Sequence, residues 1–312
     1  MNKYLKEYKW SNIRAMLRNN KVDPIECQED FTGRLVLITG ATTGIGYHTA
    51  IKFASKGANL LCINRNEEKS INLCEEIKQE YGVECNYKIA DFTHLEEIKK
   101  VATDILALNQ TIDVLIHNAG VYLTKKKFTD DDIETVFQVN YLGSFILNYM
   151  LKDKLKAQNH ARIIFVNSEG HRFAISGLKI DDLRWKKHRY TGLKGYGSAK
   201  VAQLLSMLKF KEYFNNSGVT INAMHPGDVK TNMGENNGKL YRFFKHHFIN
   251  PSAKSPKISA ESLYYLGVSK DIETESGKFF NLTTEEEPAP PALDMDMAER
   301  LWDKSLQLVG ME

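Results

Sequence analysis

The chain has 312 residues, of which 42% are hydrophobic, so it can bury the core of one large domain or two small ones. Its 42 basic and 39 acidic side chains nearly cancel and no long basic tract occurs, so nothing indicates nucleic-acid binding. No run approaches the ~18 apolar residues of a membrane span, and residues 1–10 lack the apolar core of a signal peptide. We therefore expect an enzyme-sized protein of the cytoplasm.

The cysteines indicate free thiols. The four residues Cys27, Cys62, Cys74 and Cys85 do not have the spacing of metal ligands. Cys62 stands in an apolar run, where a thiol is typically buried. We therefore predict buried, unpaired cysteines and no metal site.

Residues 1–30 predict a helical arm. Apolar side chains recur there at near-helical spacing among lysines and arginines: Leu5, Tyr8, Ile13, Met16 and Leu17. Asp23 and Pro24 then favour the end of the helix. The pattern favours a helix packed on the protein's own surface, and contact with a membrane surface is the alternative.

A glycine-rich turn follows the first predicted strand, residues 35–38, and leads into a helical pattern at residues 47–55. The turn comprises Thr39, Gly40, Ala41, Thr42, Thr43, Gly44, Ile45 and Gly46. Gly40 permits a tight turn, Gly44 lets backbone amides approach a pyrophosphate, and Gly46 lets helix and strand pack closely. An ordinary strand-to-helix turn is the alternative, but this placement favours a dinucleotide site.

The end of the next strand bears on the choice of cofactor. The strand predicted at residues 59–63 leads to Asn64 and Arg65, where an NAD enzyme would present a carboxylate to the ribose 2′-hydroxyl. Arg65 instead suits a 2′-phosphate, which favours NADP(H) over NAD(H). The alternative for Arg65 is a solvated surface arginine.

Two later strand ends add residues to the same edge. The strand at residues 85–89 leads to Asp91 and Phe92, and Asp91 suits either the adenine amino group or the cap of a helix that begins near residue 95. The strand at residues 114–116 leads to His117 and then to Asn118, Ala119 and Gly120. We expect these last three residues beside the cofactor.

The alternation of strand and helix patterns predicts the fold. It implies parallel βαβ units, and hence an α/β, doubly wound Rossmann fold: a central parallel sheet flanked by helices in a single domain. The helix predicted at residues 131–150 carries Asn140 among apolar side chains. A buried asparagine needs partners, so Asn140 is a structural hydrogen-bonding node, the holder of a water in a proton path, or both.

The candidate proton-transfer groups lie further along the chain. The strand at residues 162–166 delivers Ser168 to the rim where Gly40 and Asn118 are expected, and its hydroxyl can donate to a substrate oxygen. Tyr196 and Lys200 are four residues apart in a helical pattern, so they share one face. A cation held close to a phenol lowers its pKa, which suits the phenol to acid–base work.

From about Phe31 to its end, the chain resembles the short-chain dehydrogenase/reductase family. The matching features are the glycine segment, residues 118–120, Asn140, Ser168, the Tyr196/Lys200 pair, and a segment after residue 225 that holds Pro226, Gly227, Val229 and Thr231. The long interval from Ser168 to Tyr196, the sequence His225-Pro226-Gly227 and the Leu301-Trp302 segment resemble the retinol dehydrogenase-like branch.

This resemblance implies roles for the residues. Four residues would form a catalytic tetrad: Asn140, Ser168, Tyr196 and Lys200. Tyr196 would exchange a proton with the substrate oxygen, and Ser168 would polarise that oxygen. Lys200 would hold the ribose and lower the Tyr196 pKa, and Asn140 would support a water. Val229 and Thr231, after Pro226 and Gly227, would hold the nicotinamide carboxamide. His117 and Asn167 depart from the family pattern without removing a proton-transfer group. His171 is expected to be an orienting or a surface histidine rather than an extra acid.

The resemblance also divides the chain. Residues 1–30 are the arm and residues 31–312 the dehydrogenase domain, with a substrate lid at about 232–260 and a C-terminal helix at about 293–309. The lid is rich in aromatic and basic residues, which favours an apolar substrate, then membrane contact, then a solvated helix face. Residues 285–292, rich in Glu and then Pro, are expected to be a linker.

Two classes of function remain. The first is an NADP(H)-dependent oxidoreductase that acts on a small lipophilic alcohol, aldehyde or ketone, such as a retinoid or a steroid. The second is a cofactor-binding regulator or scaffold with the same fold and little turnover. The intact tetrad favours the enzyme. Homodimers are common in the family, although the terminal helices of this chain are placed to cover the surfaces used, and peripheral association with a membrane is a further expectation.

Overall fold

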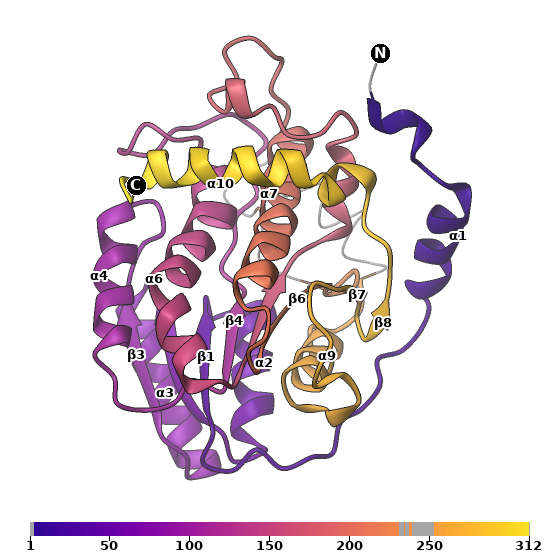
Figure 1. Cartoon of the computed structure of the whole chain (residues 1–312). Helices are drawn as coiled ribbons and strands as arrows, with labels where there is room; N and C mark the ends of the chain where they lie inside the picture. Colours follow the sequence, from indigo (N-terminus) through magenta and orange to yellow (C-terminus); the bar gives the residue numbers. More distant parts are fainter. Residues whose placement is uncertain (1–2, 231–233, 235–236, 239–252, 312) are drawn as a thin grey trace.

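The computed structural model describes residues 3–230, 234, 237–238 and 253–311. Within this part of the chain, one sheet runs through the molecule in the order β3-β2-β1-β4-β5-β6-β7-β8 (Figure 1). Its strands are β1 Leu35–Thr39, β2 Asn59–Asn64, β3 Cys85–Ile89, β4 Val114–His117, β5 Ala161–Val166, β6 Val219–His225, β7 Phe279–Asn281 and β8 Thr284–Glu285. The chain runs outward from β1 to β3, returns to β4, and then runs outward the other way, which confirms the doubly wound fold.

The pairing is parallel from β3 across to β7, and the last pair, β7 with β8, is antiparallel. The prediction of a parallel sheet is therefore confirmed for β1 to β7, but it did not include the antiparallel strand β8 at one edge. β8 is only two residues long and returns through a tight turn in which Leu282 has a positive φ of 54°. A strand so short leaves no readable periodicity in the sequence.

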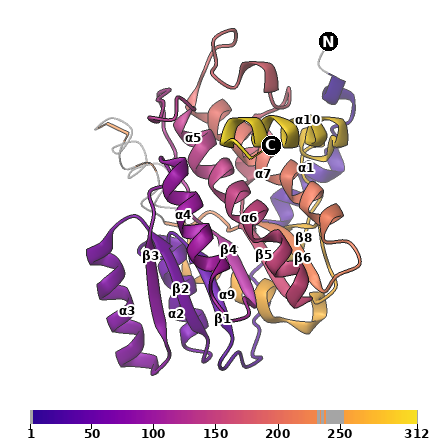
Figure 2. The ribbon, with the colours of Figure 1, turned by 60° about the vertical axis from the view of Figure 1, so that its left-hand side comes forward.

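The helices cover both faces of the sheet (Figures 1 and 2). Their bounds are α1 Trp10–Asn19, α2 Gly44–Ala54, α3 Glu67–Tyr81, α4 Leu95–Leu106, α5 Thr135–Phe137, α6 Gly143–Gln158, α7 Gly192–Tyr213, α9 Lys257–Val268 and α10 Met295–Val309. Helices α4, α6 and α7 enclose one apolar core against the sheet, and α2, α3 and α9 enclose the other.

Strand β1 shows how the sequence specifies this layering. All five of its residues are buried, as its apolar run predicts. Leu35 and Leu37 enter one core while Val36 and Ile38 enter the other, because successive strand side chains point to opposite faces.

The helix expected at residues 131–150 begins later and is interrupted. Asp132 has a positive φ of 59°, which is incompatible with an α-helix, and the side chain of Glu134 caps α5 by accepting hydrogen bonds from Val136 and Phe137. A π-helical turn, Gln138–Leu142, then separates α5 from α6. This turn contains Asn140, so the irregularity falls at a candidate site residue.

The segment expected to be a linker is instead packed into the molecule. Glu286, Ala289 and Ala292 are buried, and the amide of Glu286 donates to the carbonyl of Phe279. The composition was misleading because the prolines fit a short 3₁₀ turn, Pro290–Leu293, and the Glu286 carboxylate has buried partners.

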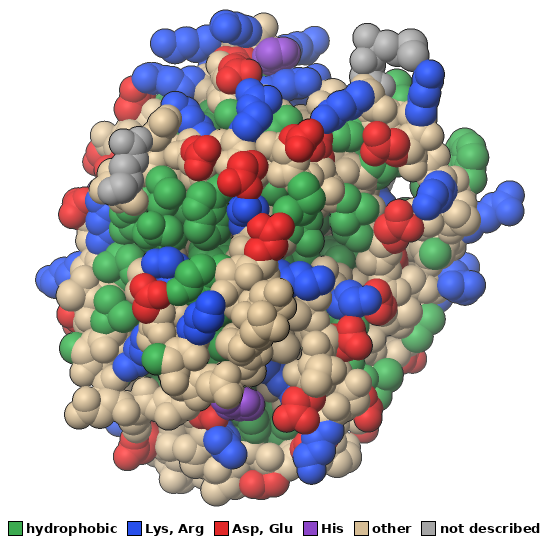
Figure 3. Space-filling model, viewed as in Figure 1, with side chains coloured by type: hydrophobic (Ala, Val, Ile, Leu, Met, Phe, Trp, Pro, Cys, Tyr) green, Lys and Arg blue, Asp and Glu red, His purple; other side chains and the backbone are tan. Residues whose placement is uncertain are grey.

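Helix α10 lies across the ends of α6 and α7 (Figure 1). The Trp302 ring makes edge-to-face contacts with Phe145 and Phe210, at centroid distances of 5.2 and 4.8 Å. Figure 3 shows hydrophobic side chains gathered in a band on this side of the molecule, with charged groups above and below it. The amphipathic pattern at the chain's end therefore docks a helix on the domain, as expected.

The arm lies against the C-terminal segment, beside β8 (Figure 1). The Tyr4 hydroxyl donates to Asp294 at 2.6 Å, and the Ile25 amide donates to the Thr283 hydroxyl at 2.9 Å. Helix α1 ends at Asn19, before the Asp-Pro pair, and it leaves Trp10 78% exposed. The arm thus packs on the protein's own surface with an apolar part left uncovered.

All four cysteines are buried and free, as predicted. Three of them cluster where α3 meets the sheet, and the sulfurs of Cys74 and Cys85 are 3.0 Å apart. No helix in the described ranges has both the length and the apolar character needed to cross a bilayer.

Candidate active site

A cleft of about 470 Å³ opens at the carboxyl ends of β1 to β4, where the winding of the sheet reverses. Its lining includes most of the residues predicted to bind the cofactor: Gly40, Thr42, Thr43, Gly44, Ile45, Arg65, Asp91, Phe92, Asn118, Ala119 and Gly120. The structure therefore brings together, from four separate strand ends, the residues that the sequence pattern placed at one edge.

The glycine turn is built as its pattern predicts. Gly40 has a φ of +71° and Gly44 a φ of +58°, a region that side chains disfavour. A Cβ atom on Gly46 would lie 2.1 Å from the carbonyl oxygen of Gly40, so only glycine permits this close approach of helix and strand. The Asn118 amide holds the turn by donating to the carbonyls of Thr39 and Gly40.

The end of β2 presents two cations to the cleft. The Asn64 side chain is buried and accepts a hydrogen bond from the Ala41 amide at 2.7 Å, so it fixes the glycine turn at the edge of the cleft. Arg65 and Lys69 are exposed and line the cleft together. Sequence reasoning missed Lys69, which belongs to the first turn of α3; its signal was a spacing of four residues from Arg65.

Asp91 and Phe92 line the cleft at the end of β3. The Asp91 carboxylate accepts hydrogen bonds from the amide and hydroxyl of Thr93. It does not cap α4, because the Leu95 amide donates to Asp131 instead. The capping alternative for Asp91 is therefore wrong, and the carboxylate remains at the cleft.

Asn140 is a hydrogen-bonding node in the π-helical turn. Its side-chain oxygen accepts from the amide of Val121, and its side-chain nitrogen donates to the Val121 carbonyl. Its backbone carbonyl accepts from the Gln203 side chain at 3.3 Å. Asn140 thus fixes Val121 in the loop after β4 and connects this loop to α7, which is the structural role left open by the sequence.

Helix α7 carries Tyr196 and the buried Lys200. The Lys200 ammonium donates to the Val166 carbonyl at 2.7 Å and lies 5.8 Å from the centre of the Tyr196 ring. Burial lowers the pKa of Lys200 to about 7, because a charge is poorly solvated there. Gln203, one turn further, accepts from Lys200 at 3.5 Å and connects it to Asn140. Gln203 was not anticipated from the sequence.

Ser168 begins a short turn that packs against Tyr196. The Ser168 hydroxyl oxygen accepts a hydrogen bond from the Gly170 amide at 3.0 Å, which leaves its own proton available to a ligand. A Cβ on Gly170 would lie 2.6 Å from the Tyr196 ring and 3.2 Å from the Ser168 hydroxyl oxygen. Gly170 therefore lies between the two candidate residues and lets them approach each other.

The residues that depart from the family pattern have structural partners. His117 is buried, stacks on Phe165 and donates to the side-chain amide oxygen of Asn148; burial lowers the pKa of His117 to about 4. Asn167 donates to the Lys200 carbonyl and accepts from the Ser168 amide, so it holds the end of β5 against α7.

The segment after β6 lies at the same carboxyl edge of the sheet. Gly227 has a φ of +76°, and the Pro226 carbonyl accepts a hydrogen bond from Ser259. Val229 pairs with Lys254 as an isolated bridge. Thr231 and almost all of the expected lid before residue 253 lie outside the described residues, and residues 257–260 belong to α9.

Comparison with known proteins identifies the chain's relatives. The model of the short chain dehydrogenase family matches residues 34–179. Retinol dehydrogenase 13 of Homo sapiens is 36% identical over 286 residues, which cover 90% of this chain and 86% of that protein. The chain belongs to the short-chain dehydrogenase family. Retinol dehydrogenase 12 of Mus musculus, 32% identical with 90% and 87% covered, places it in the retinol dehydrogenase-like branch.

Solved structures of short-chain dehydrogenases share this fold. One from Shigella flexneri has a TM-score of 0.66 at 21% identity, over 85% of this chain and 96% of that one. Another from Shigella flexneri, complexed with NADP, has a TM-score of 0.64 at 21% identity, over 82% and 99%. Short-chain dehydrogenases are oxidoreductases that use a nicotinamide cofactor, and the cleft described above has the glycine turn that such a cofactor requires.

Proposed function

We propose that this short-chain dehydrogenase transfers a hydride between NADP(H) and the carbonyl or alcohol carbon of a lipophilic substrate, with Tyr196 as the acid–base group. The observation that carries the proposal is the buried ammonium of Lys200 beside the Tyr196 ring. The Tyr196 ring packs on Tyr122, and Tyr122 lines the cleft that suits a dinucleotide. A cation so placed stabilises the phenolate more than the phenol. Tyr196 then exchanges its proton more readily at neutral pH.

The remaining residues divide the chemistry between them. The nicotinamide, when bound, supplies or accepts the hydride. Ser168 donates its hydroxyl proton to the substrate oxygen, since the Gly170 amide already occupies one of its lone pairs. In the reductive direction Tyr196 gives its proton to that oxygen, and in the oxidative direction it takes the proton back. Asn140 fixes the strand end beside the cofactor and supports a water that relays protons from Lys200 to solvent.

A preference for NADP(H) is supported by two cations. Arg65 and Lys69 line the cleft next to the end of β2, where the ribose 2′-position of a bound dinucleotide would lie. Both are exposed, so each can reorient to meet a 2′-phosphate through charge-assisted hydrogen bonds. Asp91 faces the adenine, while Val229 and Thr231 hold the carboxamide.

An apolar substrate is supported by the surroundings of Tyr196. The Tyr122 ring packs edge-on against the Tyr196 ring, with centroids 5.7 Å apart. Phe173 lies close to Gly197, the residue after Tyr196, and Leu193 belongs to the first turn of α7; they are 50% and 48% exposed. Uncovered apolar side chains around a proton donor favour a hydrophobic alcohol, aldehyde or ketone.

The experiment that tests this function follows NADPH absorbance with carbonyl compounds of graded chain length. We expect kcat/KM to rise with the apolar length of the substrate, by roughly fivefold or more for each pair of added methylenes that the site buries. NADPH binding without turnover of any compound would instead support the regulator. The same assay with NADH measures the cofactor preference.

We also propose that the arm contacts a membrane surface. Trp10, Leu5 and Leu17 are 78%, 56% and 56% exposed, and Arg14 and Arg18 stand exposed on the same helix as Trp10. This combination suits an interface with anionic lipid. Sedimentation with phosphatidylserine vesicles tests it: Trp10→Ser with Leu17→Ser should abolish binding, and equal binding by the parent and the double variant would exclude this surface.

A further inference from the structure

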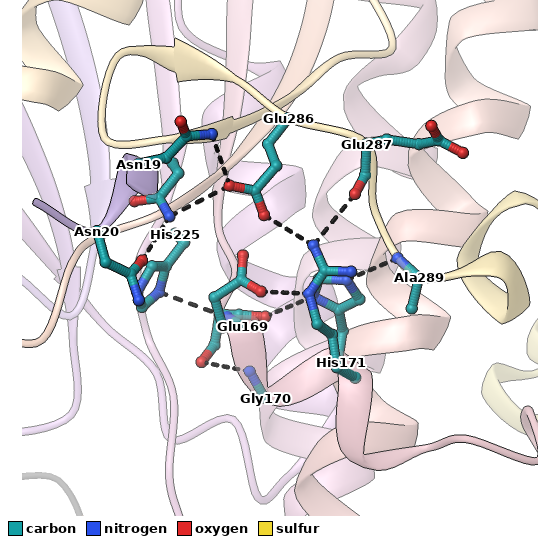
Figure 4. A network of polar contacts seen from close by, with 12 residues as sticks. Asn19, Asn20, Glu169, Gly170, His171, His225, Glu286, Glu287 and Ala289 are labelled. Carbon is teal, nitrogen blue, oxygen red and sulfur yellow. Dashed lines mark hydrogen bonds and ion pairs between the residues drawn. The ribbon is translucent and has the colours of Figure 1, made fainter. Parts of the chain in front are cut away.

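The turn that begins at Ser168 is hydrogen-bonded to a distant part of the chain. This turn comprises residues 168–173, and two of its side chains reach the segment at residues 286–289, more than 110 residues further along the chain (Figure 4). The two side chains that make these hydrogen bonds belong to His171 and Arg172. His171 contacts the backbone of Ser168, the residue whose hydroxyl we assign to the substrate oxygen.

His171 forms the first connection. Its Nδ1 atom lies 2.7 Å from the Ser168 carbonyl oxygen, so that nitrogen donates. Its Nε2 atom accepts a hydrogen bond from the Ala289 amide at 3.0 Å. Burial lowers the pKa of His171 to about 3, so the ring is neutral and has one fixed tautomer. The ring therefore orients the Ser168 backbone and does not serve as an acid.

Arg172 forms the second connection. Its guanidinium bonds Glu169 within the turn, at 2.5 Å, and Glu286 outside it, at 2.7 Å. It also donates to the Glu287 carbonyl at 3.1 Å. Burial, followed by the neighbouring Glu286, raises the pKa of Glu169 to about 7 even though Arg172 opposes the shift. Removal of the arginine would leave two buried carboxylates without the cation that they share, which is strongly destabilising.

The arm completes this arrangement (Figure 4). The buried Asn19 side chain, at the end of α1, donates to the Glu286 carboxylate at 3.0 Å. Asn281 of β7 donates to the Asn20 side chain at 2.6 Å and to the same carboxylate at 3.4 Å. A continuous set of hydrogen bonds thus runs from α1 through Glu286 and Arg172 to the turn.

The turn transmits its position to both proton-transfer groups. Gly170 lies between the Ser168 hydroxyl and the Tyr196 ring, and the space there is too small for a methyl group on Gly170. A Cβ on Gly197 would in turn lie 2.9 Å from the Gly170 carbonyl oxygen, so the turn and α7 touch through backbone atoms. A displacement of the turn by a few tenths of an ångström therefore changes the distance between Ser168 and Tyr196.

We propose that Arg172 and Glu286 are positioning residues, through which the seated N-terminal arm sets the placement of the Ser168 hydroxyl beside Tyr196. The proposal rests on the function proposed above for Ser168 and Tyr196. It assigns to the arm a role in the reaction itself, in addition to any role at a surface. Neither Arg172 nor Glu286 touches the reacting atoms; both act through Ser168.

The kinetic test compares Arg172→Gln with the milder Arg172→Lys. We expect Arg172→Gln to lower kcat about tenfold or more, with the dissociation constant of NADPH changed less than twofold, and Arg172→Lys to fall between it and the parent. In a Ser168→Ala background, Arg172→Gln should change kcat less than twofold, because the group that it positions is gone. Arg300→Gln is the matched control, since it breaks an arginine–carboxylate contact to Asp181 away from the turn.

Unchanged kcat in Arg172→Gln, or equal factors in the parent and Ser168→Ala backgrounds, would overturn the proposal. If Arg172 were needed only for folding, Arg172→Gln would lower kcat by the same factor in the parent and in the Ser168→Ala background, and it would also weaken NADPH binding. If Arg172→Gln does not fold, the Arg172→Lys cycle is read in the same way.

The second test needs no turnover. Hydrogen exchange is measured on the full chain carrying Asn19→Ala, with Arg300→Gln again as control. We expect the amides of Gly170 and His171, which bond Ser168, to exchange at least about fivefold faster in Asn19→Ala and at the parent's rate in the control. Equal rates in Asn19→Ala and parent would refute the connection from the arm. If Asn19→Ala exchanges faster than the parent but the parent reduces no carbonyl compound, the connection from the arm stands and only the proposed function is refuted.

Discussion

The Nζ atom of Lys200 lies 5.8 Å from the centre of the Tyr196 ring, and both residues belong to α7. The ammonium is held there by the Val166 carbonyl at the end of β5, the same strand that delivers Ser168. The helix and the strand therefore bring a phenol, a cation and a hydroxyl to the carboxyl edge of the sheet, where the cleft also opens. This arrangement is the basis of the predictions that follow.

Replacement of Lys200 by methionine changes how stability depends on pH. The folded protein holds the Lys200 proton less tightly than the unfolded chain does, since burial lowers its pKa from 10.5 to about 7. Between these values the unfolded state binds more protons, so the stability of the parent rises with pH. Relative to Lys200→Met, the parent should gain up to ~1.4 kcal/mol per pH unit from about pH 7.5 to 9.5. Urea denaturation at several pH values measures the difference, and parallel curves would contradict it.

Reversal of the charges at the end of β2 should change the cofactor preference. Arg65→Asp with Lys69→Glu removes both cations near the 2′-position and adds repulsion, so NADPH affinity should fall about a hundredfold while NADH affinity changes little. Lys78→Glu, further along α3, is the control for a general effect of charge. Fluorescence titration with each dinucleotide gives the ratio, and equal affinities of the parent for NADH and NADPH would refute the role of Arg65.

Alanine at Gly46 should damage both the fold and the cleft. Its Cβ would lie 2.1 Å from the Gly40 carbonyl and 2.5 Å from the Asn118 side chain, so the glycine turn must shift. We expect a loss of ~1–3 kcal/mol in unfolding free energy and loss of dinucleotide binding. Gly82→Asn is the control, because its φ of +67° is open to asparagine and no atom lies near. Tight dinucleotide binding by Gly46→Ala would show that the close packing is not required.

The sequence was informative wherever local pattern decides the structure. The apolar run in β1, the glycine turn and the strand ends at Arg65, Asp91 and Asn118 could be placed because periodicity and turn chemistry are properties of short segments. The family resemblance then connected Ser168 with Tyr196 across a long insertion. Each of these features depends on few residues close in the chain.

The rest depends on contacts between distant segments. The later start of the helix near Asp132 reflects a single positive φ and the capping by Glu134. Glu286 looked like part of a solvated linker, and only the folded chain brings Arg172 and Asn19 to it. Gln203 lacked a motif of its own, so its place beside Lys200 became visible only in the structure. Lys69 had only its four-residue spacing from Arg65, and the structure places both in the cleft.

The most direct measurement of the central claim is single-turnover hydride transfer in Tyr196→Phe. The variant keeps the ring that packs on Gly170 and Tyr122 and removes only the hydroxyl. We expect NADPH to bind within about twofold of the parent, while the rate of carbonyl reduction falls by at least about a thousandfold. A rate close to that of the parent, with NADPH bound equally well, would show that another group donates the proton and would contradict the account.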